Sequence, residues 1–185
     1  MSKEILDDAE RRMKSAVEST RKELANIRTG RANVGLLDHV MVSAYGAELP
    51  VNQTATISIP EPRQILITPF DRSQLGAIEK AILKSDLNLN PNNDGNAIRL
   101  NIPPMTEERR KQMVKQTHTE IEHGRVAIRN VRRDANEHLQ KKEKAHAISE
   151  DECKRSQEQV QKLTDKYIHE LDEIQKHKEA ELMEV

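Results

Sequence analysis

The feature that most constrains the fold is a long helical seam in the second half of the chain. Apolar, small and a few polar residues recur there at alternating spacings of three and four, at Val114, Thr117, Ile121, Gly124, Ile128, Val131, Ala135 and His138. This spacing places them on one side of an α-helix, and that side leaves water only by packing against other helices. Thr106 is a suitable N-cap, because Glu107 and Glu108 follow it and favour the positive end of the helix dipole.

Two further amphipathic stripes predict two more helices. The first runs from Ile5 to Ile27 and ends near Gly30, with an apolar face formed by Leu6, Ala9, Met13, Ala16, Thr20, Leu24 and Ile27. The other begins at Ser149, where Ser149-Glu150-Asp151-Glu152 has the capping-box pattern. Its apolar face continues through Val160, Leu163, Tyr167, Leu171, Ile174 and Leu182. At about 1.5 Å per residue these helices form a rod of roughly 40–60 Å, and a monomer is expected because the stripes cover one another.

The segment between the first two helices has a different pattern. All seven Pro and five of the six Gly lie between residues 30 and 104. Short strands are predicted at His39–Ser43, Thr54–Ile59, Gln64–Thr68 and Ala97–Ile102, with a hairpin turn at Tyr45-Gly46 and one helix over Ser73–Lys84 after Asp71. The predicted fold class is therefore α+β: an elongated antiparallel three-helix bundle, residues 1–30 and 105–185, with a small β/α/β insert, residues 31–104.

The insert leaves and rejoins the bundle through two chain crossings that we predict act as a hinge. One crossing is Thr29-Gly30-Arg31 and the other is Ile102-Pro103-Pro104-Met105. Glycine can take unusual backbone angles, whereas the proline pair stiffens the return. Rotation of the insert is therefore expected in preference to free flapping.

The formal net charge is only −1, but basic charge is concentrated in one segment. Residues 106–133 carry eight basic and four acidic side chains, and residues 134–185 carry nine and fourteen. Arg125, Arg129, Arg132 and Arg133 lie in a stretch without an acid between Glu122 and Asp134. Guanidinium groups at helical spacing suit a regular array of phosphates. A solvated helix face is the plainer alternative.

Composition limits the other possible functions. No run of apolar residues is long enough for a membrane span and the N-terminus is too acidic for a leader, so a cytosolic protein is expected. The single Cys153 excludes an internal disulfide and fits a reducing compartment. With only Tyr45, Phe70 and Tyr167 as aromatics, any RNA would be bound through its backbone and shape rather than by base stacking.

Catalytic, metal and cofactor sites are not expected. The seven His residues form no HExxH or Cys/His ligand pattern. The Asn88–Gly95 segment lacks the spacing and distal Glu of an EF-hand, and turn chemistry explains it better. Arg28-Thr-Gly-Arg31 lacks the arrangement of a nucleotide loop, so it is either a phosphate-binding elbow or a simple helix stop.

Several long motifs in order resemble those of the bacterial ribosome recycling factors, and the resemblance covers essentially the whole chain. The motifs are Ile27-Arg-Thr-Gly-Arg-Ala-Asn, Asp86-Leu-Asn-Leu-Asn-Pro-Asn, Ile98-Arg-Leu, Pro103-Pro-Met-Thr-Glu-Glu-Arg-Arg-Lys, Arg125-Val-Ala-Ile-Arg-Asn-Val-Arg-Arg-Asp-Ala-Asn and Ser156-Gln-Glu-Gln-Val-Gln-Lys-Leu-Thr-Asp.

The resemblance implies an L-shaped molecule with proportions like transfer RNA. It also implies that the bundle binds 23S rRNA of the large subunit within the 70S ribosome, and that elongation factor G, consuming GTP, drives the insert to separate the subunits. The factor itself would make and break no covalent bond. Residues expected at the RNA interface are Arg28, Arg31, Arg110, Arg125, Arg129, Arg132 and Arg133.

Two alternatives from other classes stay open at this point. A coiled-coil adaptor that binds only protein would show no salt-sensitive association with ribosomal subunits. A hydrolase hidden in the small domain would turn over a substrate without any partner.

Overall fold

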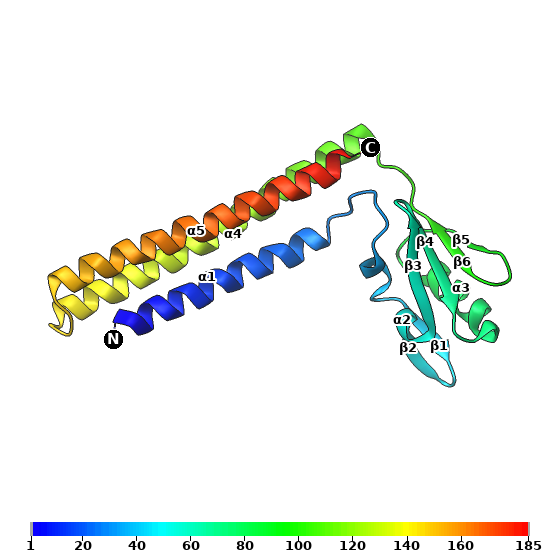
Figure 1. Ribbon diagram of the computed structural model, residues 1–185, viewed down its shortest axis with the longest axis horizontal. Coiled ribbons are helices and arrows are strands. Elements are labelled where there is room, and N and C mark those ends of the chain that lie inside the picture. The colour runs from blue at the N-terminus through cyan, green and yellow to red at the C-terminus, as the bar shows by residue number, and fades with distance from the viewer. Residues whose placement is uncertain (1, 185) are drawn as a thin grey trace. The chain divides into compact units, whose positions relative to one another are not determined.

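The computed structural model describes residues 2–184, and these form two compact units, one made of residues 2–29 and 107–184 and the other of Gly30–Thr106. The first unit contains three helices, α1 (Ser2–Ala25), α4 (Glu107–Lys144) and α5 (Glu150–Met183). All three pack against one another, and α4 runs antiparallel to the other two (Figure 1). At 24, 38 and 34 residues the helices are about 36, 57 and 51 Å long. The predicted antiparallel three-helix bundle is confirmed.

Local hydrogen bonds determine where α4 ends and α5 begins. The Ser149 side chain accepts a hydrogen bond from the Glu152 amide at 3.1 Å, as the capping box predicts. At the end of α4, the Ala147 amide donates to the Lys142 carbonyl at 2.9 Å, and His146 takes a positive φ of 56°. This closes the helix in a Schellman-type turn, and α5 can then run back along α4.

The seam of α4 differs from the predicted one at both ends. Met113 and Leu139 are buried, whereas Val114 is half-buried and His138 is exposed. Over 38 residues the buried positions follow the period of a straight α-helix more closely than a strict heptad, which drifts by about 20° for every seven residues. In α1 the same effect places Val17, and not Ala16, in the core.

The second unit contains two antiparallel sheets and one main helix around a shared core. β1 (Met41–Ala44) pairs with β2 (Ala47–Pro50), and a second sheet has the order β3-β4-β6-β5. Its strands are β3 (Ala55–Glu61), β4 (Gln64–Pro69), β5 (Pro91–Asn93) and β6 (Ile98–Asn101). The helices are η1 (Val34–Leu37), α2 (Val51–Thr54), η2 (Arg72–Gln74) and α3 (Leu75–Lys84). The α+β fold class is confirmed, and β2, β5, η1 and α2 add to the predicted elements.

The core of this unit is made by alternate residues of the strands and one face of α3. Ile65 and Ile67 of β4 and Ile98 and Leu100 of β6 are fully buried, because the two strands pair in register across their inner faces. Ile78 of α3, with Ile82 one turn later, joins the same cluster. The insert therefore has a hydrophobic core independent of the bundle.

Candidate nucleic-acid interface

The basic residues of α4 are held in place by the core beneath them. Ile128, Val131 and Ala135 are buried against the other helices, and this fixes the rotation of α4 about its axis. Arg129 and Arg133, four residues apart, then project as neighbours from the exposed side. Because a well-packed helix sets their spacing, these two guanidinium groups are presented on a rigid surface.

Arg125 is bound by side chains of α5, and this contact was not predicted from the sequence. Its Nη2 donates to Asp172 Oδ1 at 2.5 Å and to Gln175 Oε1 at 3.1 Å, and its side chain is only 24% exposed. The pKa of Arg125 is raised, first because of its hydrogen bond to Asp172. The sequence around Arg125 gave no sign of this pairing, because Asp172 lies on another helix.

The Glu122 carboxylate contacts two of the predicted arginines. Its Oε2 accepts from Arg125 Nη1 and its Oε1 accepts from Arg129 Nη1, both at 3.3 Å. Glu122 is 52% exposed and Arg129 is 45% exposed. One carboxylate thus bridges two guanidinium groups at the surface.

Arg132 and Arg133 differ in their surroundings. Arg132 donates from Nη1 to Gln161 of α5 at 3.4 Å, so it lies at the boundary between the two helices. Arg133 is exposed and pairs with no other residue of the described chain. Its sequence neighbour Asp134 forms a 2.9 Å ion pair with Arg12 of α1. Among the four clustered arginines, Arg132 and Arg133 therefore make no ion pair within residues 2–184.

The three remaining predicted arginines are divided between the two units. Arg28 is exposed in the turn that follows α1. Arg110 is half-buried in the first turns of α4, and its Nε is buried without a hydrogen-bond partner among the described residues. Arg31 is exposed and belongs to the second unit.

The two chain crossings lie close together at the base of the insert. Gly30 has a φ of +79°, and a Cβ added there would lie 3.6 Å from Met105 Cγ. The Ala32 amide donates to the Pro62 carbonyl at 2.7 Å, and the Ile102 amide donates to the Arg63 carbonyl at 2.8 Å. Both crossings are therefore anchored on the same β3–β4 turn, which restricts independent bending of either crossing beyond these points.

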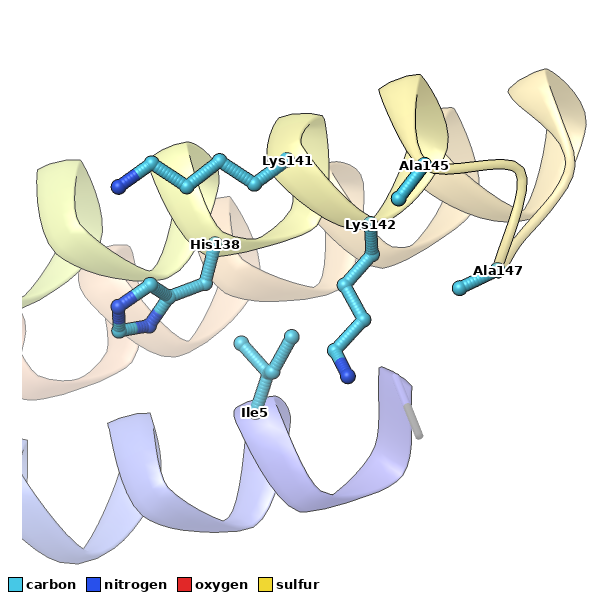
Figure 2. Close-up of a pocket in the computed structure, with 6 residues that line it drawn as sticks. All are labelled: Ile5, His138, Lys141, Lys142, Ala145 and Ala147. Atoms are coloured by element: carbon cyan, nitrogen blue, oxygen red, sulfur yellow. The ribbon is translucent and has the colours of Figure 1, made fainter.

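A hollow of about 400 Å³ lies at the α4–α5 turn end of the bundle, where Ile5 of α1 faces the last turns of α4 (Figure 2). Its lining is Ile5, His138, Lys141, Lys142, Ala145 and Ala147. Cationic side chains thus surround an apolar floor, and the lining includes neither a carboxylate nor a hydroxyl group.

Two buried titratable side chains of the bundle, Tyr167 and Cys153, have raised pKa values. Tyr167 is buried and donates to Glu10 Oε1 at 2.9 Å; burial is the main reason that its pKa is raised to about 12. Burial also raises the pKa of the Cys153 thiol. Within residues 2–184 no group of three or more His, Cys, Asp or Glu residues is arranged to hold a metal ion. In the same range, no helix is long and apolar enough to cross a membrane.

Comparisons with known proteins give one consistent result. The family described as "Ribosome recycling factor" matches residues 20–183. Proteins named "Ribosome-recycling factor" from Symbiobacterium thermophilum and Halalkalibacterium halodurans are 60% and 54% identical to this chain, each over the full length of both sequences.

Two similar solved structures have related descriptions. The "solution structure of the ribosome recycling factor" has a TM-score of 0.78 and 47% identity, covering 100% of this chain and 98% of that one. The other has a TM-score of 0.66 and 46% identity, covering 100% of both chains. It is described as "Models for the T. thermophilus ribosome recycling factor and the E. coli elongation factor G bound to the E. coli post-termination complex".

Proposed function

The chain belongs to the ribosome recycling factor family, and on that premise we propose that it is a translation factor that separates the subunits of the post-termination ribosome together with elongation factor G and GTP. The similar structure described with elongation factor G and a post-termination complex supports this choice of partners. The bundle binds 23S rRNA of the large subunit within the 70S ribosome. The insert acts as the moving part, so the factor performs mechanical work and no covalent chemistry.

The observation that carries the proposal is the arrangement of arginines on α4. Arg129 and Arg133 project side by side from a helix whose opposite side is buried, and Arg132 lies at the edge facing α5. Phosphates along an RNA strand can accept bidentate hydrogen bonds from such groups. Arg125, half-buried and bound to Asp172, offers fewer free donors and mainly supports this surface. We propose Arg28, Arg31 and Arg110 as further contacts.

The two-unit organisation supports a division of labour. Residues 1–30 and 105–185 are proposed to anchor the factor, and residues 31–104 to transmit force. The insert can move as one body because it has its own core and because both crossings are hydrogen-bonded to its β3–β4 turn. The hinge is then confined to Thr29–Arg31 and Ile102–Met105.

Co-sedimentation with 70S ribosomes and large subunits, followed by a splitting assay with and without elongation factor G and GTP, tests the proposal. We expect salt-sensitive binding by the chain alone and splitting only when elongation factor G and GTP are both present. Failure to sediment with ribosomes at low ionic strength would leave only a protein-binding role. Turnover of a substrate by the protein alone would instead indicate an enzyme.

A further inference from the structure

Arg125 of α4 has one firm acidic partner, Asp172, and one weaker acidic partner, Glu122. Arg125 is bound to Asp172 at 2.5 Å in a half-buried pair, whereas both contacts of Glu122 are 3.3 Å long. The Glu122 carboxylate is also more than half exposed. Exposed ion pairs of this length contribute little to stability, so Glu122 is held far less firmly than Arg125.

The contact between Glu122 and Arg129 spans seven residues, which is about two helical turns or 10.5 Å along α4. Favourable side-chain pairs on a helix normally lie three or four residues apart. Both side chains therefore extend toward each other to meet. Their meeting point lies beside Arg125 Nη1, so two guanidinium groups converge on one carboxylate.

A carboxylate held by two guanidinium groups has the same chemistry as a phosphate held by them, namely anionic oxygens that accept charge-assisted hydrogen bonds. We propose that Glu122 occupies a phosphate-binding position between Arg125 and Arg129 and must be displaced when RNA binds there. Displacement leaves Arg125 in place, because Asp172 and Gln175 hold its other nitrogen. The inference rests on the proposed function and makes Glu122 a residue that limits affinity and favours release.

The test compares Glu122→Gln with Glu137→Gln for binding to isolated large ribosomal subunits at fixed salt. Glu137 is an exposed acid of α4 that pairs with no residue of the described chain, so its change controls for the loss of one negative charge. Both variants should fold, since each replaces an exposed Glu with another good helix former. We expect Glu122→Gln to bind about three- to tenfold more tightly than Glu137→Gln and to dissociate more slowly, because two weak ion pairs no longer compete.

The same comparison in an Arg129→Ala background separates competition from a general charge effect. The advantage of Glu122→Gln over Glu137→Gln should shrink there, because one of the two competed groups is missing. If Glu122→Gln weakens binding, the residue positions Arg129 and the inference is overturned. Equal effects of the two Gln variants, or an undiminished advantage without Arg129, would also overturn it. If instead Arg129→Ala alone leaves subunit binding unchanged, the proposed function loses its RNA contact.

Discussion

Individual side chains in this protein owe their roles to neighbours that are distant in sequence. Three arginines of α4 follow one another at helical spacing but have different partners. Arg125 is bound to Asp172, Arg129 contacts Glu122, and Arg132 contacts Gln161. The sequence predicted that α4 presents a run of arginines, because that depends only on local periodicity. It could not predict the pairing of Arg125, because that depends on the register of α5 against α4.

Tyr167 gives a prediction at the residue scale. Its pKa in the folded protein is raised to about 12, above the ordinary value of 10, so folding favours the protonated phenol. This contribution is fully present below about pH 10 and is lost as the pH rises toward 12. We expect the unfolding free energy to fall by about 1–3 kcal/mol more in the wild type than in Tyr167→Phe over this range. Denaturant titrations at several pH values measure it, and equal pH dependence in both proteins would contradict it.

At the scale of elements, α4 approaches both of its neighbouring helices tightly at Gly124. An added Cβ would lie 2.5 Å from Thr20 Oγ1 of α1 and 3.1 Å from Leu171 Cδ1 of α5. We expect Gly124→Ala to lower the unfolding free energy by about 1–3 kcal/mol, because overpacking outweighs the gain in helix propensity. Gly76→Ala in α3 is the matched control, since a Cβ there meets nothing within 4 Å and should stabilise by about 0.5–1 kcal/mol. Stabilisation by both changes in thermal unfolding would mean that the bundle adjusts freely at Gly124.

The predictability of elements followed the strength of their local signals. The three long helices and the cap at Ser149 were predicted because periodicity and capping chemistry act within one segment. β5 was missed because Pro91–Asn93 has only three residues and forms a strand through its pairing with β6. The seam of α4 was placed one residue off at each end, because a heptad extrapolates poorly along a straight helix of this length.

For the whole molecule, the bundle and the insert are separate compact units, and the proposed function gives them different tasks. Replacing Pro103 and Pro104 together with Gly should leave binding to large subunits almost unchanged, because the arginines of α4 lie outside the hinge. Splitting in the presence of elongation factor G and GTP should slow, because a flexible return transmits force poorly. Splitting at the wild-type rate would show that hinge stiffness is irrelevant, and reduced binding would show that the crossings belong to the anchoring surface.

The central claim is that arginines on a rigid helix anchor the protein through ribosomal RNA phosphates. The most direct measurement is the affinity for large ribosomal subunits as a function of salt concentration, for the wild type and for the combined Arg129→Ala, Arg132→Ala and Arg133→Ala variant. Each lost phosphate contact should reduce the slope of log affinity against log salt by about 0.7–0.9, so the variant should lose roughly two to three units of slope. An unchanged slope in a folded variant would contradict the account.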